Sequence, residues 1–150
     1  MLYKDIIKLE RNADDWYIGA NGYKCYISDN AIINDNIYIG SNVYINENVK
    51  IGFNAIIGSN VYIGSNVRIY DDVIIYDDVR IDDDVRIDDN VYIGSNVIIY
   101  ENVRIYDDVR INDNAIIGSN VIIDENVIIY DDVRIDELHY DILSEDDFKI

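Results

Sequence analysis

The hydrophobic pattern of this chain repeats every six residues. From residue 27 to residue 134 the sequence divides, without any insertion, into eighteen hexads such as IYDDVI, IYDDVR and IGSNVI. The first position is always isoleucine, the fifth is Val, Ala or once Ile37, and the fourth is always Asn or Asp. A helix needs apolar residues at a spacing near 3.6 and a half-buried strand needs strict alternation, so neither element alone explains the period.

The alternation of side chains along a strand accounts for half of each hexad. The fifth position and the first position of the next hexad are two residues apart, so both can point inward while the sixth position points outward. Positions two to four must then turn a corner, and Asn or Asp at position four tolerates the left-handed backbone that a tight corner needs. Each hexad is therefore predicted to form one short strand and one corner.

Three such hexads are expected to form a triangular coil of eighteen residues, and successive coils should stack as parallel strands about 4.8 Å apart. The aliphatic-x-x-x-small-x units of residues 27–134, and with less regularity of 21–140, resemble the hexapeptide-repeat family of bacterial transferases. The resemblance implies an all-β fold, a left-handed parallel β-helix (solenoid) of about six coils with a cap at each end. Rival repeats of five or nine residues fit this sequence badly.

The ends of the chain are expected to differ from the coils, because the open edges of a stacked sheet need cover. Residues 1–20 are predicted to form an N-terminal cap, with Trp16 as a candidate lid over the first coil. Residues 21–140 are predicted to form the β-helix, with Cys25 in a small inward position that favours core packing over a reactive thiol. Residues 141–150 are predicted to form an acidic C-terminal cap or tail.

Composition and charge exclude several classes of partner. The formal net charge of −18 argues against nucleic acid and against anionic membrane surfaces, since both attract basic proteins. No apolar run approaches the length of a membrane span, and the first residues carry charges where a leader segment would be apolar. A single cysteine excludes an internal disulfide framework. We therefore expect a cytoplasmic or intracellular protein.

One face of the predicted β-helix is flat and apolar. Every third hexad should superimpose, so the outward residues of one face and their flanking neighbours can be assigned from the sequence. An apolar patch of this kind indicates an interface, although high β-propensity alone also explains outward Ile and Tyr. The predicted interface residues are Tyr38, Ile56, Ile74, Tyr76, Tyr92, Ile128 and Tyr130.

A second face carries a ladder of four stacked cations, Lys50, Arg68, Arg86 and Arg104. Stacking of guanidinium groups on tyrosines and pairing of arginines with aspartates are expected to offset the repulsion between these cations.

Carboxylates gather at the corners, where water and the preference of Asp for turns explain them. One corner edge also permits a sharper hypothesis, because stacked carboxylates need counter-charge and calcium prefers oxygen ligands. The candidate calcium edge consists of Asp71, Asp72, Asp88, Asp89, Asp107, Asp108, Asp124 and Glu125.

Catalysis is the least supported prediction. The family resemblance implies acyltransferases that form trimers, bind acyl-CoA between neighbouring β-helices and use a histidine as general base. This chain has one histidine, His139, beyond the regular coils, and no loop interrupts the hexads. We therefore expect a non-catalytic scaffold without a cofactor, which self-associates or binds a protein partner through its flat face. The alternative is a hexapeptide-repeat acyltransferase that uses coenzyme A and His139, and a third option is an idealised repeat sequence without activity.

Overall fold

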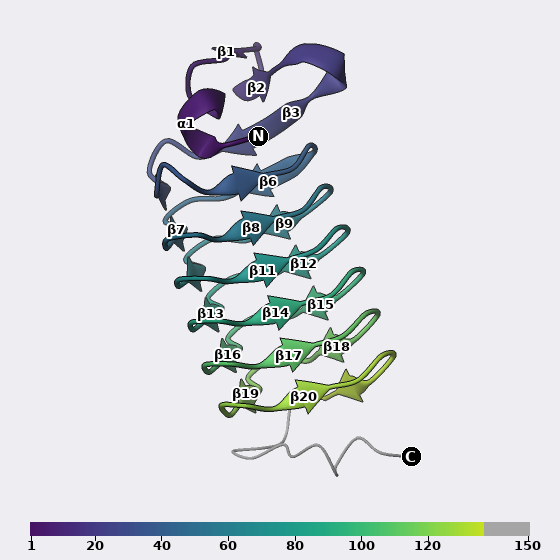
Figure 1. The fold of residues 1–150 in the computed structure, drawn as a ribbon. Coiled ribbons are helices and arrows are strands. Elements are labelled where there is room, and N and C mark those ends of the chain that lie inside the picture. The colour runs from purple at the N-terminus through teal and green to yellow at the C-terminus, as the bar shows by residue number, and fades with distance from the viewer. Residues whose placement is uncertain (137–150) are drawn as a thin grey trace.

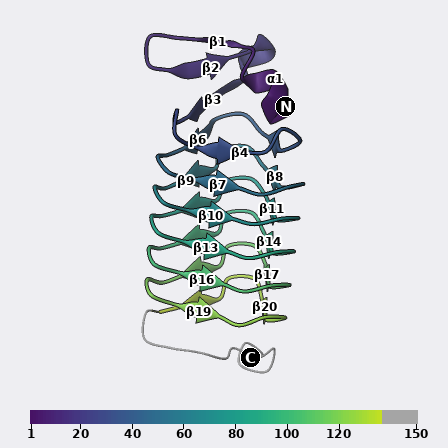
Figure 2. The ribbon, with the colours of Figure 1, turned by 90° about the vertical axis from the view of Figure 1, so that its left-hand side faces the viewer.

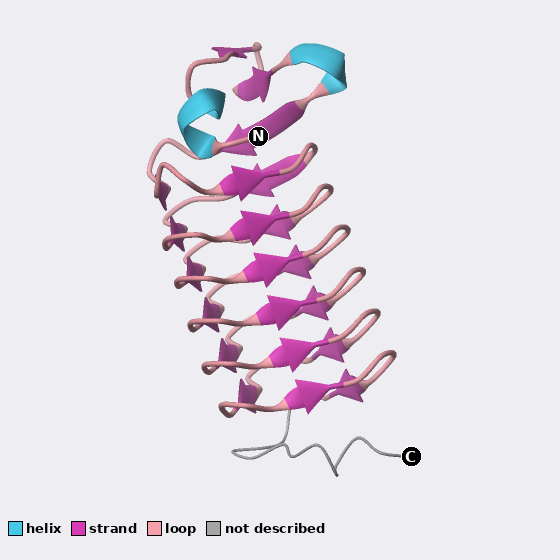
Figure 3. Cartoon of the chain, viewed as in Figure 1, coloured by secondary structure: helices cyan, strands magenta, loops and turns pink. Residues whose placement is uncertain are grey.

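The computed structural model describes residues 1–136, which form a parallel β-helix (Figure 1). Each turn of the chain contributes one short strand to each of three sheets, which confirms the all-β solenoid of about six coils predicted from the six-residue period. Within residues 1–136, helix is limited to α1 (Tyr3–Ile6) and the 3-10 helix η1 (Ala20–Gly22), both before the first regular coil (Figure 3). No helix within residues 1–136 is long and apolar enough to cross a membrane.

The three sheets run the length of the β-helix, and Figure 2 shows one of them from the front. The nine-stranded sheet contains β1 (Glu10–Arg11), β2 (Trp16–Ile18), β3 (Lys24–Ile27), β6 (Val43–Ile45), β9 (Tyr62–Ile63), β12 (Arg80–Ile81), β15 (Ile98–Ile99), β18 (Ile116–Ile117) and β21 (Arg134–Ile135). The second sheet, here called the cationic sheet, contains β4 (Ile32–Ile33), β7 (Lys50–Ile51), β10 (Arg68–Ile69), β13 (Arg86–Ile87), β16 (Arg104–Ile105) and β19 (Ile122–Ile123). The third, here called the neutral sheet, contains β5 (Tyr38–Ile39), β8 (Ile56–Ile57), β11 (Ile74–Ile75), β14 (Tyr92–Ile93), β17 (Arg110–Ile111) and β20 (Ile128–Ile129).

The strands of the coils pair in parallel with a register of eighteen residues. On the cationic sheet, for example, Arg68 lies between Lys50 and Arg86. On the neutral sheet, Ile74 lies between Ile56 and Tyr92. The structure therefore superimposes every third hexad, and each outward residue lies on the face that the sequence predicts.

The core is a column of the first and fifth residues of each hexad. Ile87 is completely buried and Val85 is 1% exposed, and the other coils repeat this arrangement. Burial of these side chains is the main favourable contribution to folding, because apolar area leaves water at every coil. Cys25 occupies an inward position of β3 and is also completely buried, as core packing requires.

The corners depend on the residue at hexad position four. From Asn42 to Asp132 every residue at this position has a left-handed backbone, with φ between 57° and 64°. Asn and Asp adopt this conformation more easily than other residues with a side chain, because their short polar groups form local hydrogen bonds. The side chains also bond along the axis, as where the Asn48 amide donates to Asn66 Oδ1 at 3.2 Å. The corner chemistry predicted from the sequence is therefore confirmed over this range.

The N-terminal end is closed by residues other than the predicted lid. Strand β2 pairs antiparallel with β3, which directs Tyr17 inward opposite Cys25 and leaves Trp16 on the outer side opposite Tyr26. Ile6 of α1 is completely buried and Tyr17 is 8% exposed, whereas Trp16 is only partly buried. The Trp16 ring contacts the outward rings of Tyr26 and Tyr44, with centroids 6.1 and 5.9 Å apart. The prediction of Trp16 as a lid over the core was therefore wrong.

Candidate functional surfaces

The neutral sheet carries the residues that the sequence predicts as an interface. Tyr38, Ile56 and Tyr76 are exposed, while the other members of the set are partly buried. The Tyr76 and Tyr92 rings lie 4.9 Å apart, and burial together with a hydrogen bond to Tyr76 raises the pKa of Tyr92. Arg110, the one cation among the outward strand residues described on this face, stacks over Tyr92 at 4.5 Å. The structure thus brings the predicted residues together, and their role as an interface stays a prediction.

The two most exposed large apolar side chains of the described residues lie outside the predicted set. Phe53 is 59% exposed at the corner between β7 and β8, and Ile32 is 61% exposed on β4. Phe53 carried a signal in the sequence, because it is the only aromatic residue at position three of the eighteen hexads. Both residues enlarge the apolar surface of the first coils.

Most outward arginines are paired with the residue two positions later. The Nε group of Arg86 donates to Asp88 Oδ1 at 2.6 Å, and Arg80 and Arg134 bond their own i+2 aspartates at 2.7 and 2.8 Å. These arginine–aspartate pairs form because position six of one hexad and position two of the next both point outward, on either side of the inward isoleucine. The hydrogen bond raises the pKa of Arg86 above its ordinary value, so the cation is held more firmly.

The ladder on the cationic sheet is not uniform. Arg86 stacks over Tyr70 at 4.8 Å and Arg104 stacks over Tyr106 at 4.6 Å, as expected from the sequence. Lys50 and Arg68 are exposed, and neither takes part in an ion pair within residues 1–136. The reason is local, since the i+2 residues of these two cations are Gly52 and Tyr70, which offer no carboxylate.

An open groove of about 250 Å³ lies beside these two cations. Neither aspartate nor glutamate lines it, although the chain carries thirty acidic residues. The lining residues are Ile32, Asn34, Lys50, Ile51, Gly52, Arg68, Ile69 and Tyr70.

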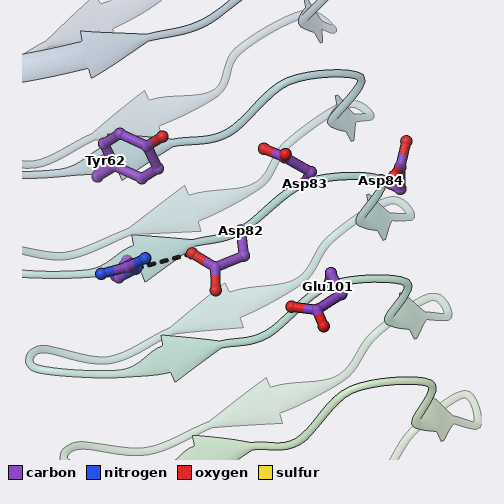
Figure 4. A pocket seen from close by; sticks show the side chains of 6 residues that line it. Tyr62, Asp82, Asp83, Asp84 and Glu101 are labelled. Carbon is purple, nitrogen blue, oxygen red and sulfur yellow. Dashed lines mark hydrogen bonds and ion pairs between the residues drawn. The ribbon is translucent and has the colours of Figure 1, made fainter.

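The larger groove, of about 330 Å³, has the opposite character (Figure 4). Its lining consists of Tyr62, Arg80, Asp82, Asp83, Asp84 and Glu101. Asp82 accepts a hydrogen bond from Arg80, whereas Asp83 and Asp84 accept hydrogen bonds from the preceding coil. Figure 4 shows Glu101 on the next coil. Four carboxylates around one paired cation repel a phosphate group, so this groove is unsuited to an anionic ligand.

The acidic edge proposed for calcium gains no support from the geometry. Its carboxylates accept hydrogen bonds from the backbone of the preceding coil, as where Asp71 N–H donates to Asp89 Oδ1 at 2.9 Å. The Asn54 amide likewise donates to Asp72 Oδ1 at 3.0 Å. Asp88 instead pairs with Arg86. Within the described part of the chain, no group of three or more His, Cys, Asp or Glu residues is arranged to hold a metal ion.

Cys25 has the environment of an inert thiol. Burial raises its pKa, and the hydroxyl group of Tyr23 lies 3.6 Å from Sγ. A buried thiol with a raised pKa forms little of the thiolate that reacts with oxidants and metals. His139 and the predicted C-terminal segment 141–150 lie outside the described residues, so the domain boundaries stay a prediction.

Comparisons with known proteins agree with this architecture. The family model for the bacterial transferase hexapeptide (six repeats) matches residues 90–124. No curated protein matches the chain at a significant level.

Two solved structures illustrate the likeness of fold. A candidate acetyltransferase from Bacillus cereus is 24% identical with a TM-score of 0.58, over 76% of this chain and 70% of that one. A histidine-to-alanine variant of GDP-perosamine N-acetyltransferase from Caulobacter crescentus, solved with CoA and GDP-perosamine, is 16% identical with a TM-score of 0.50. That match covers 73% of this chain and 50% of the enzyme, so the chain spans half of the enzyme's length. Residues 90–124 therefore resemble bacterial transferase hexapeptide repeats, and the observed coils show that the hexads of this chain fold as a parallel β-helix.

Proposed function

We propose that this chain is an acyltransferase-like hexapeptide-repeat protein that binds acyl-CoA and self-associates through its β-helix. The observation that carries the proposal is the transferase family match at residues 90–124, within coils whose fold is shared with an acetyltransferase solved with CoA. This reverses the order of the two functions expected from the sequence, because those findings support the transferase better than the non-catalytic scaffold and favour coenzyme A over the absence of a cofactor.

The described surfaces offer one groove that fits coenzyme A and one that does not. The groove beside Lys50 and Arg68 presents cations and apolar side chains, which suit the phosphates and the organic parts of this cofactor. The groove around Asp83 and Glu101 is acidic and does not suit them. When bound, acyl-CoA would supply an activated thioester whose acyl group passes to an acceptor nucleophile.

The general base of this proposal is His139, the only histidine of the chain. A neutral imidazole can accept the proton that an attacking amine or hydroxyl group loses as it forms the new acyl bond.

The test uses the full chain with coenzyme A and with acetyl-CoA. Coenzyme A is expected to raise the melting temperature, and acetyl-CoA with a panel of amino sugars and alcohols is expected to release the CoA thiol. His139→Asn should abolish thiol release while the stabilisation by coenzyme A is retained. A protein that shows neither stabilisation nor thiol release with any acceptor would contradict the proposal.

A second function, a scaffold that associates through the neutral sheet, is favoured by one observation. The outward residues of that sheet include no carboxylate, and Ile56 is 43% exposed although the chain has a net charge of −18. Two copies of this acidic chain that face each other through the neutral sheet would meet little charge repulsion.

Light scattering distinguishes the two functions. Ile56→Asp should reduce the mass of an assembly formed through the neutral sheet, whereas Ile32→Asp, an exposed isoleucine of the cationic sheet, should leave that mass unchanged. A scaffold is expected to associate in the same way with and without coenzyme A. An acyltransferase should also respond to the cofactor.

A further inference from the structure

We propose that Lys50 and Arg68 bind the phosphate group of a small-molecule ligand in the groove on the cationic sheet. The inference concerns phosphate recognition and stands whether or not the ligand takes part in acyl transfer.

The two cations are adjacent and point the same way. Lys50 and Arg68 are register partners on neighbouring parallel strands, which places their backbones about 4.8 Å apart. Both occupy the outward position of their hexad and both are exposed. Two like charges at this separation repel each other, so an anion that binds both relieves an unfavourable contact in the free protein.

No carboxylate within residues 1–136 forms an ion pair with either cation. Asp71, at the corner after β10, accepts a hydrogen bond from the Phe53 N–H at 2.8 Å and forms no ion pair with either cation. The next cation along the ladder, Arg86, is paired with Asp88 at 2.6 Å. Within residues 1–136, Arg86 is thus the one ladder cation with an ion pair, and Lys50 and Arg68 are the two adjacent exposed cations without one.

The groove also has the shape for a phosphate with an organic group attached. Gly52 lies between the two cations in the chain, and the space that a side chain would take there is filled by the Asp71 carboxylate and the Tyr70 backbone of the next coil. A Cβ atom at this position would lie 2.8 Å from the carbonyl carbon of Tyr70, so a larger residue would need the backbone to move. Ile32 and Tyr70 line the sides, where an apolar or aromatic group of the ligand can pack.

Charge complementarity indicates the class of ligand. Because the chain has a net charge of −18, it repels any anion at long range. Binding must therefore come from direct contacts with the two cations, and phosphate oxygens form such charge-assisted hydrogen bonds with both Lys and Arg.

The experiment is a calorimetric titration of the full chain with inorganic pyrophosphate at low ionic strength. The double variant Lys50→Gln/Arg68→Gln is expected to lose at least about tenfold in affinity, because two charge-assisted hydrogen bonds are removed. The matched control, Arg80→Gln/Arg134→Gln, makes the same change in net charge on the nine-stranded sheet and should bind as the unaltered chain does. Arg68→Lys should retain binding, which guards against a loss caused by misfolding.

The outcomes are distinct. Absence of saturable pyrophosphate binding to the unaltered chain, or equal losses in the two double variants, would overturn the inference. Adenosine diphosphate identifies the source of the phosphate in a second titration. Tighter binding than pyrophosphate supports a nucleotide whose base packs on the apolar lining, and equal binding supports recognition of the phosphates alone. Because coenzyme A stabilisation and thiol release are separate measurements, the acyltransferase proposal can fail while this inference holds.

Discussion

The interior and the exterior of the β-helix are built on opposite rules. Inside, one coil is nearly the same as the next, because isoleucine and valine or alanine recur at the inward positions. Outside, the same strands carry cations on one sheet and Tyr or Ile on another. On β13, for instance, completely buried Ile87 follows Arg86, which is only partly buried. The comparison teaches that the repeat encodes the fold, whereas the departures from the repeat on the outer faces encode recognition.

A substitution in the core is expected to lower the free energy of unfolding more than any substitution on the outer faces. Ile87→Ala is expected to lower the free energy of unfolding by about 2–5 kcal/mol, because it leaves a cavity in a column that cannot collapse. Ile74→Ala changes the same residue type at an outward position and should cost less than about 1 kcal/mol. Chemical denaturation measures both, and equal losses would contradict the division between interior and exterior.

An exposed residue can nevertheless be costly where the backbone needs it. Asn66 has φ of 60°, and Asn66→Val is expected to cost about 1–2 kcal/mol because a β-branched residue is strained in the left-handed region. Asn36 has the same place in its hexad without a left-handed backbone, so Asn36→Val is the control and should cost less. Chemical denaturation of the two variants compares their free energies of unfolding. The difference separates the cost of the left-handed backbone from the effect of side-chain burial.

The titration of Cys25 tests the interior in another way. Burial raises the pKa of this thiol above the ordinary value of 9.0, so the folded state disfavours the thiolate. The resulting stability is complete below pH 9.0 and is lost as the pH rises from there through the raised pKa, with a slope of at most about 1.4 kcal/mol per pH unit. Denaturation between about pH 8 and pH 10 should reveal this decline, ahead of most tyrosine titration. Cys25→Ala should lack that component, and an identical pH profile in the variant would refute it.

The smallest effect is expected for an outer ion pair. Asp88→Asn keeps an oxygen that can accept from Arg86, as Asn112 already does for Arg110 at 2.9 Å. We expect a loss of less than about 1 kcal/mol, because the hydrogen bond is retained and the Arg86 side chain is 38% exposed, although Asp88 itself is buried. A loss of unfolding free energy as large as that of Ile87→Ala would show that outward charged residues also stabilise the fold substantially, and would contradict the comparison.

The sequence alone was sufficient for the coils and their faces. The inward residues such as Val85 and Ile87 follow from the six-residue period, and the stacking of Arg68 on Lys50 follows from the eighteen-residue coil. Periodicity predicts these features because every hexad forms the same strand and corner.

The remaining features depend on contacts that no repeat specifies. Trp16 lies in the irregular N-terminal segment, where antiparallel pairing with β3 decides which side chains point inward. The contrast between paired Arg86 and unpaired Arg68 did leave a signal, Arg-Ile-Asp against Arg-Ile-Tyr, but its meaning requires the i+2 geometry of the corner. Catalysis by His139 depends on residues beyond the repeat pattern, which periodicity cannot place.

The eighteen-residue register also limits how such a protein can change its length in evolution. Duplication of a whole coil adds one strand to each sheet and leaves every later residue on its original face. Duplication of a single hexad upstream of Arg86 would instead rotate all that follows by one face, moving Arg86 from the cationic sheet to the neutral sheet. An insertion or deletion therefore preserves the outer surfaces only when its length is a multiple of eighteen residues, which is one whole coil.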